Sequence, residues 1–213
     1  MIQSATGLIL RTRPLTETSL IVQWLTPDLG RVATVAKGAR RANSPFAGKL
    51  DLFYLADFSF ARSRRSELHT LREVSLRETH RALRTELGFL RQAAYGAALI
   101  EQTTEIETPL PGVSELLRGL LAHLPAQPPR ALTVFAFEMK LLQELGQLPD
   151  LADHKLSAGA QRILADLTHQ NWPMFAQLKP SAPQTREIQQ FLHGFLIYHL
   201  GKIPAGRNAA LSE

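Results

Sequence analysis

The stretch SLIVQWLTPDLGRVATVAKGARR, residues 19–41, decides the fold of the N-terminal part of the chain. Residues 19–26 are rich in β-branched and aromatic side chains and residues 31–36 alternate in hydrophobicity, so both segments predict strands. Between them, residues 27–30 (PDLG) have the composition of a turn, because Pro fixes φ, Asp bonds to its own backbone and Gly accepts a positive φ. The stretch therefore predicts a β-hairpin that runs directly into a cluster of cations.

Three further segments on either side of this hairpin also predict strands, and they are Gly7–Arg13, Leu52–Ala61 and Leu68–Arg77. Five short strands in about 70 residues favour a closed or partly open barrel, because closure removes exposed strand edges. The five-stranded OB-fold is a common architecture of this size and binds oligonucleotides. An SH3-like barrel fits the same strand pattern.

After His80 the apolar residues recur with the period of a helix, and this pattern predicts five helices. Their expected positions are Phe89–Ile106, Val113–Leu124, Arg130–Leu145, a helix capped by Ser157, and a last helix from about Pro183 to Gly201. Arg130–Leu145 is apolar on nearly every side, so we expect it at the centre of a bundle. We therefore predict an α+β protein with two domains, an OB-fold barrel over residues 1–79 and an all-α bundle over residues 80–213.

The positive charge is unevenly distributed along the chain. The net charge is +5, with 12 Lys and Arg against 7 Asp and Glu in residues 1–80 and 12 against 12 in residues 81–213. An excess confined to the predicted barrel indicates a surface that binds polyanions. The candidate contacts are the cluster Lys37, Arg40 and Arg41 with the neighbouring Arg31, Lys49, Arg62, Arg64 and Arg65. The alternative is a solvated basic loop that only keeps the protein soluble.

Barrels that bind single strands combine a basic groove with aromatic side chains on which bases stack. Trp24, Phe46 and Tyr54 are the candidates for stacking, although each also suits the core or an ordinary surface position. Phe53, Phe58 and Phe60 lie in an apolar strand and are expected in the barrel core.

The sequence carries no recognisable catalytic or cofactor-binding signature. It has no Cys, which excludes disulfides, thiolate zinc sites and a Cys nucleophile, and it has no nucleophile elbow, Walker A loop, dinucleotide fingerprint or HExxH pair. Asp150, Asp153 and His154 cluster, but no second ligand pair follows, so a polar loop is the better interpretation. We expect no metal, no cofactor and no enzymatic activity. Since no apolar run is long enough to span a membrane or to serve as a signal peptide, we also expect a cytoplasmic protein.

Several segments resemble the RecO family of bacterial recombination mediators. They are TGLILRTRPLTETSLIVQWLT, PDLGRVATVAKGARR, FEMKLLQELGQLPDL, LSAGAQRIL and FLHGFLIYHLG, in that order and over nearly the whole chain. The resemblance implies an OB-fold followed by a helical domain, with the family's DNA-binding cations at Lys37, Arg40 and Arg41. It also implies binding of single- and double-stranded DNA, annealing of complementary strands, help in loading recombinase onto coated strands, and a location at the nucleoid.

The partners implied by the resemblance are RecR, the acidic tail of single-strand-binding protein, RecA filaments as the end product and, in some systems, RecF. Arg118, Arg130 and Lys140 are candidates for contacting the acidic tail. One departure from the family is clear. Many relatives carry a four-cysteine zinc module where this chain has only residues 151–155, without Cys, so we infer that the module is deleted.

Three other functions remain as alternatives to a recombination mediator. An RNA-binding OB protein of the translation machinery would be distinguished by competition between RNA and single-stranded DNA. A scaffold that docks an acidic protein would not bind DNA at moderate salt. An enzyme is the alternative with least support, because no nucleophile, base and orienting group assemble in the sequence.

Overall fold

The computed structural model describes residues 1–153 and 155–212, which form two compact units. The first, the barrel unit, comprises Met1–Arg81 together with Thr104–Glu115; the second, the helical unit, comprises Ala82–Thr103 and the chain from Leu116 onward. The expected domain border at residue 79 stays a prediction. Residues 104–115 also belong to the barrel unit, although the sequence pattern had placed them in the helical domain.

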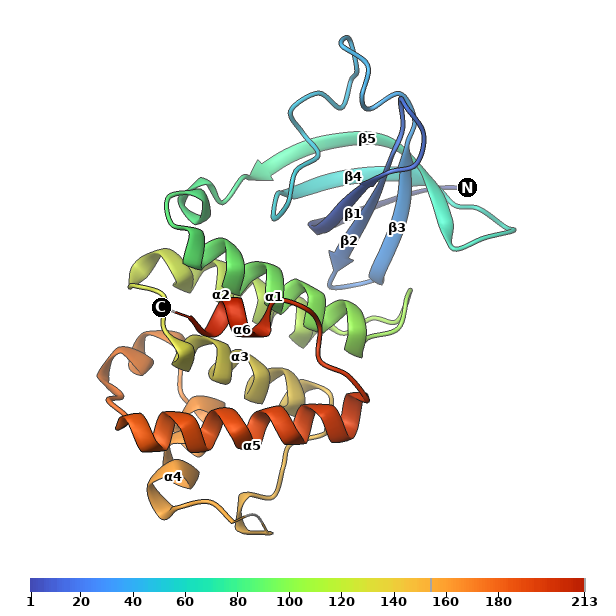
Figure 1. Cartoon of the computed structure of the whole chain (residues 1–213). Helices are drawn as coiled ribbons and strands as arrows, with labels where there is room; N and C mark the ends of the chain where they lie inside the picture. Colours follow the sequence, from blue (N-terminus) through green and yellow to red (C-terminus); the bar gives the residue numbers. More distant parts are fainter. Residues whose placement is uncertain (154, 213) are drawn as a thin grey trace. The chain divides into compact units, whose positions relative to one another are not determined.

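In the described residues, five strands close into a barrel in the order β1-β2-β3-β5-β4 (Figure 1). The strands are β1 (Ile2–Pro14), β2 (Leu20–Thr26), β3 (Gly30–Ala36), β4 (Leu55–Ala61) and β5 (Leu68–Glu78). Neighbours pair antiparallel except β3 and β5, which pair in parallel. This topology confirms the predicted OB-fold, and it is followed by the predicted helices.

The barrel closes around side chains that alternate along the strands. Trp24 and Phe58 stack at 4.0 Å between ring centroids, and Phe60 follows next to Phe58 at 5.7 Å. Because β-strand side chains alternate between two faces, every second residue of β2 and β4 points into this core. Phe58 and Phe60 are therefore core residues, as expected, and Phe53 is also buried.

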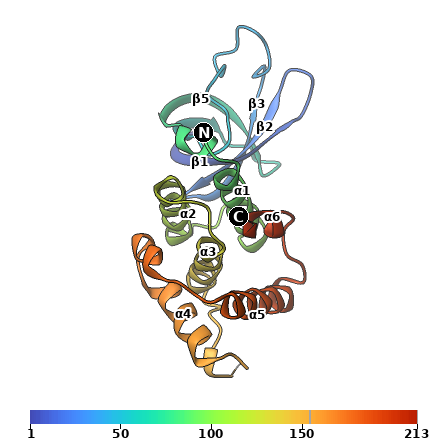
Figure 2. The same cartoon turned by 60° about the vertical axis from the view of Figure 1, so that its left-hand side comes forward.

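The helical unit packs around one central helix. Its helices are α1 (Leu87–Thr103), α2 (Pro111–His123, of which Leu116–His123 belong to this unit), α3 (Ala131–Glu144), α4 (Ala158–His169), α5 (Ala182–Leu200) and α6 (Arg207–Leu211), with 3-10 turns η1 (Arg81–Arg84), η2 (Leu124–Ala126), η3 (Leu151–Asp153) and η4 (Trp172–Gln177). α3 lies between α1 and α5 (Figures 1 and 2) and is buried along most of its length, which confirms its expected central position. The caps expected at Ser157 and Gly201 are also present.

A buried ion pair in this unit escaped the sequence analysis. The guanidinium of Arg207 on α6 donates from Nε and Nη2 to the two carboxylate oxygens of Glu138 on α3, at 2.7 and 2.9 Å. The Tyr95 hydroxyl of α1 donates to the same carboxylate at 2.6 Å, and burial of the Tyr95 side chain, together with the negative charge of Glu138, raises the pKa of Tyr95. The network ties three helices together at a point where Glu138 is fully buried.

Candidate nucleic-acid interface

The segment between β3 and β4 carries a cluster of exposed cations. Lys37, Arg40 and Arg41 are all exposed, and Lys49, at the far side of the same segment, is half-exposed. Gly38 has a φ of 70°, a value that favours glycine and lets the chain turn immediately after Lys37. In the part of the chain that the structure describes, no carboxylate pairs with Lys37, Arg40 or Arg41. Their charges are therefore available to an external anion.

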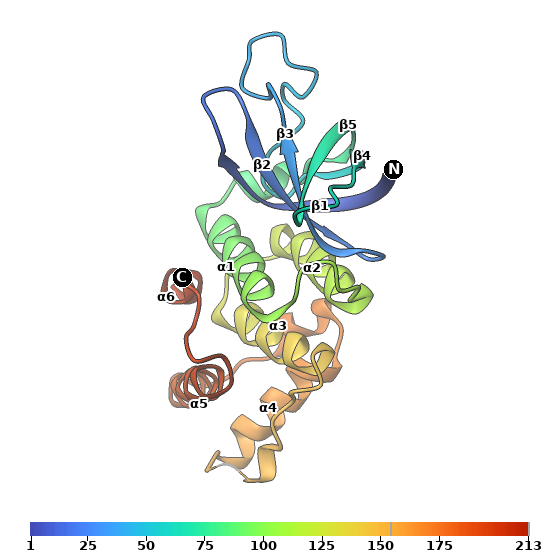
Figure 3. The same ribbon diagram turned by 90° about the vertical axis from the view of Figure 1, so that its right-hand side faces the viewer.

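The long segment is held in place at two points. Phe46 inserts its ring into the barrel core and is 6% exposed. The backbone N–H of Arg40 donates to the Thr18 carbonyl at 3.0 Å, and its guanidinium reaches the Thr16 carbonyl at 3.4 Å. The cationic loop is thus fastened to the tip of the β1–β2 hairpin, and both extend from the same end of the barrel (Figure 3).

The strand register explains why these segments meet. Pro14 at the end of β1 pairs with Leu20 at the start of β2, and Leu20 pairs in turn with Ala36 at the end of β3. The same end of the barrel also carries Arg13, an exposed cation that the sequence analysis missed. Arg13 directly precedes Pro14, which ends the first strand, and this position next to the loop was the sequence signal that could have identified it.

The structure separates the remaining candidates from this end. β5 runs parallel to β3 and starts opposite Ala33, so the β4–β5 loop with Arg62, Arg64 and Arg65 lies towards the start of β3, whereas Lys37 follows its end. β3 has seven residues and is therefore about 20 Å long, so these arginines are distant from Lys37. Arg64 and Arg65 are exposed, and Arg62 forms an ion pair with Glu107 at 2.6 Å. An exposed pair of this kind contributes about 0–1 kcal/mol to stability.

Arg31 does not belong to the exposed cationic surface. Its Nε donates to the Thr104 hydroxyl at 2.9 Å and its Nη2 donates to the Thr104 carbonyl at 2.5 Å. The guanidinium therefore fastens Thr104 to the barrel, and the assignment of Arg31 as a DNA contact stays a prediction.

The proposed stacking residues face the barrel interior. Trp24 is fully buried, donates its indole N–H to the Thr34 hydroxyl at 2.8 Å and stacks on Phe58, so it cannot receive a base. Phe46 is buried as the anchor of the cationic loop. Tyr54 is half-buried against the same core. The stacking assignment was wrong for Trp24 and Phe46, because an apolar barrel of this size needs its large rings inside, and it stays untested for Tyr54.

The three cations assigned to a partner tail differ in their surroundings. Arg130 donates to the carbonyls of Phe175 and Leu178 at 3.2 and 2.7 Å, and Lys140 donates to those of Thr168 and Gln170 at 2.8 Å each. Both therefore donate hydrogen bonds to carbonyl oxygens of their own unit, and burial lowers the pKa of Lys140. For these two, contact with a partner tail stays a prediction. Arg118 is exposed on α2 and stays a prediction.

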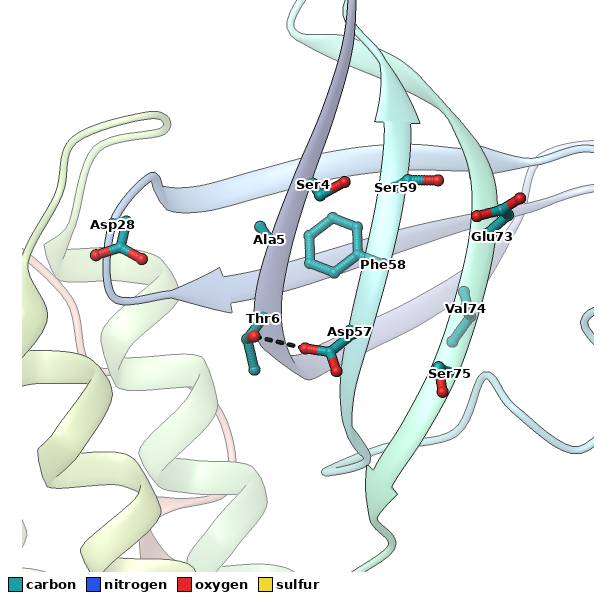
Figure 4. Close-up of a pocket in the computed structure, with 10 residues that line it drawn as sticks. All are labelled: Ser4, Ala5, Thr6, Asp28, Asp57, Phe58, Ser59, Glu73, Val74 and Ser75. Carbon is teal, nitrogen blue, oxygen red and sulfur yellow. Dashed lines mark hydrogen bonds between the residues drawn. The ribbon is translucent and has the colours of Figure 1, made fainter.

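The barrel unit also has an open groove of about 650 Å³ between β1, β4, β5 and the β2–β3 turn (Figure 4). Three carboxylates, those of Asp28, Asp57 and Glu73, line it. The Asp57 carboxylate accepts hydrogen bonds at 2.6 Å from Arg77 and from Thr6, and these hold its pKa below the usual value. Because carboxylates repel phosphates, this groove does not suit a nucleic-acid backbone.

Within the described residues, no three His, Cys, Asp or Glu side chains gather as a metal site would require. The candidate His154 lies outside the described residues. Among the described helices, none is both long and apolar enough to cross a bilayer.

Two family models match the chain, one described as recombination protein O N terminal over residues 1–80 and one as recombination protein O C terminal over residues 90–156. A protein of Anaeromyxobacter sp. (strain K), named DNA repair protein RecO, is 34% identical over 95% of this chain and 93% of its own length. The chain belongs to the RecO family.

Two relatives from Bacillus carry the same name as the Anaeromyxobacter protein. The protein of Bacillus subtilis (strain 168) is 27% identical over 95% of this chain and 82% of its own length. That of Bacillus pumilus (strain SAFR-032) is 32% identical over 71% of this chain and 58% of its own length. The family assignment thus agrees with the sequence segments that suggested it, and the inferred loss of the zinc module at residues 151–155 stays a prediction.

Proposed function

We propose that this protein is a recombination mediator in DNA repair. It binds single- and double-stranded DNA through the end of the barrel that carries Lys37, Arg40 and Arg41, anneals complementary strands, and assists loading of recombinase onto strands coated by single-strand-binding protein. The observation that carries the proposal is the set of three exposed cations that pair with no carboxylate of the described residues, on a loop that Arg40 fastens to the β1–β2 hairpin. Membership of the RecO family, whose relatives are named DNA repair proteins, supports the same role.

The physical mechanism is neutralisation of phosphate charge. Two complementary strands repel each other, and cations that bind phosphates on both strands lower this repulsion and let the bases pair. Most of the affinity then comes from released counterions, so engagement of about five phosphates on single strands gives a slope of log K against log salt of about −3.5. Because phosphate contacts do not read bases, the sequence preference is weak.

The partners that we propose are RecR, the tail of single-strand-binding protein, and RecA as the recombinase, with RecF in some systems. The exposed Arg118 in the helical unit remains the candidate for contacting an acidic tail. The same charge pattern would also serve RNA, so competition between RNA and single-stranded DNA belongs in the first binding experiments. Preference for RNA would favour the translation-machinery alternative.

The decisive experiment compares strand annealing and DNA binding by the wild type and the triple variant Lys37→Ala, Arg40→Ala, Arg41→Ala. Loss of three phosphate contacts reduces the slope by about 2 and the affinity at 0.1 M salt by about a hundredfold. Folding should be retained, because exposed side chains usually change stability by less than about 0.5 kcal/mol each.

A matched control removes the same charge from exposed positions of the helical unit, through Arg91→Ala, Arg162→Ala and Arg186→Ala. This control should bind and anneal almost like the wild type. Equal losses in both triple variants would show that only net charge matters, and unchanged annealing by the Lys37, Arg40 and Arg41 variant would refute the proposed interface.

A further inference from the structure

Residues 104–108 lie against the barrel as a strap at the end where β3 begins. The backbone N–H of Glu107 donates to the Arg31 carbonyl at 2.9 Å, and Ile106 forms an isolated parallel bridge with Arg31. Arg31 in turn holds Thr104 through its guanidinium. At Gly30 a side chain would collide with the backbone carbonyl of Thr108, so the close approach of this strap requires glycine.

The strap brings one carboxylate to the β4–β5 loop. Oε2 of Glu107 accepts a hydrogen bond from Arg62 at 2.6 Å, and its Oε1 lies 2.7 Å from Nε2 of His69. The N–H of Ser63 donates to Nδ1 of His69 at 3.3 Å, so the ring proton is on Nε2 and points at the carboxylate. Glu107 itself has a φ of 55°, which a non-glycine residue seldom adopts and which only surrounding contacts maintain.

The loop around this carboxylate has the composition of a phosphate site. Besides Arg62 it exposes Arg64 and Arg65, and the hydroxyls of Ser63 and Ser66 lie 3.2 Å apart beside them. A carboxylate and a phosphate accept hydrogen bonds from the same guanidinium and imidazole donors. Glu107 therefore occupies the position in which Arg62 and His69 would hold an anion from outside.

We propose that the β4–β5 loop is a second site for nucleic-acid phosphates and that Glu107 masks it. The inference rests on the proposed function, since it assumes that the barrel binds a nucleic-acid backbone. Arg62 is 46% exposed and Glu107 28% exposed, so water already weakens their attraction and an incoming phosphate can displace the carboxylate. The two cationic loops lie towards opposite ends of β3, a strand that is about 20 Å long. Such a separation allows the barrel to hold two different strands.

The test is a double-mutant cycle of Glu107→Gln and Arg62→Ala, with a single-stranded oligonucleotide of mixed sequence as the probe. Glu107→Gln keeps an oxygen that accepts from His69 but removes the charge that neutralises Arg62. One additional cation for phosphate makes the salt slope more negative by about 0.7 and raises affinity about fivefold at 0.1 M salt. The gain should vanish in the double variant, because it requires Arg62.

The control is Glu105→Gln, which changes the net charge equally at an exposed position of the same strap. Its affinity and slope should match those of the wild type, and a thermal melt of each variant checks that the barrel remains folded. A gain equal in Glu105→Gln and Glu107→Gln, or a gain that persists without Arg62, overturns the masked site. Wild-type binding that depends on Lys37, Arg40 and Arg41, with no effect of Glu107→Gln, overturns this inference alone. If neither the wild type nor the Glu107→Gln variant binds the oligonucleotide, the proposed function is overturned as well.

Discussion

The loop after β3 and the interior of the helical unit place their cations in opposite surroundings. On that loop Lys37, Arg40 and Arg41 face solvent and pair with no carboxylate of residues 1–153 or 155–212, whereas in the helical unit Arg130, Lys140 and Arg207 donate to carbonyl or carboxylate groups of the same unit. The contrast does not lie in net charge. Because Arg81, Glu105, Glu107 and Glu115 belong to the barrel unit, that unit has 13 Lys and Arg against 10 Asp and Glu, and the helical unit has 11 against 9. What differs is the surroundings of the individual cations.

The physical reason is the different cost of a charge inside and outside the protein. A buried ion without a partner is strongly unfavourable, so the helical unit surrounds its inner cations with acceptors. An exposed cation is solvated by water and needs no partner. It can therefore remain ready for an anionic ligand, and three such cations on one fixed loop form a binding surface.

The largest expected effect is a loss of thermal stability when the buried ion pair between Arg207 and Glu138 is broken. Arg207→Met leaves the buried Glu138 carboxylate with only the Tyr95 hydroxyl, and loss of one partner of a buried pair costs about 3–5 kcal/mol. For a protein of this size the melting temperature should fall by roughly 6–20 °C. Calorimetry measures this fall. Arg186→Met, at an exposed position of α5, is the control and should melt within about 2 °C of the wild type.

A smaller effect is expected in the barrel, where Phe46 holds the cationic loop. Phe46→Ala should reduce the free energy of unfolding by about 3 kcal/mol and also weaken DNA binding, although every cation is retained. Urea denaturation and DNA titration measure the two effects, with Leu15→Ala at an exposed hairpin position as the control. Weaker binding at unchanged stability would instead restore Phe46 as a stacking residue.

The smallest expected effect is a pH dependence of the stability of the helical unit, which comes from the buried side chain of His123. Burial lowers the pKa of His123 below its ordinary 6.5, so the unfolded chain takes up this proton before the folded one. Stability of the helical unit should therefore decrease as the pH falls below about 6.5, and His123→Phe should reduce this slope. Urea midpoints between pH 7 and 5 measure it. An identical slope in both proteins would contradict the assignment to His123.

The sequence was most informative where one residue type fixes the local backbone. The PDLG turn fixed the β2–β3 hairpin, and Ser157 and Gly201 marked helix ends, because caps and turns depend on a few adjacent residues. Lys37, Arg40 and Arg41 were recognisable because they follow a predicted strand directly. Trp24 was ambiguous, since an aromatic ring suits both the inside of a barrel and a base-stacking surface, and only strand register decides between them.

The sequence by itself determined the class of the fold, the order of its strands and helices, and the excess of positive charge in residues 1–80, because periodicity, turn composition and charge are local properties of the chain. Only the tertiary structure decided which cations are available. The return of residues 104–108 to the barrel joins Glu107 to Arg62 across 45 positions and holds Arg31 at Thr104, and α6 brings Arg207 to Glu138 across 69. Contacts between residues so far apart depend on how the whole chain packs, and no short segment of sequence contains them.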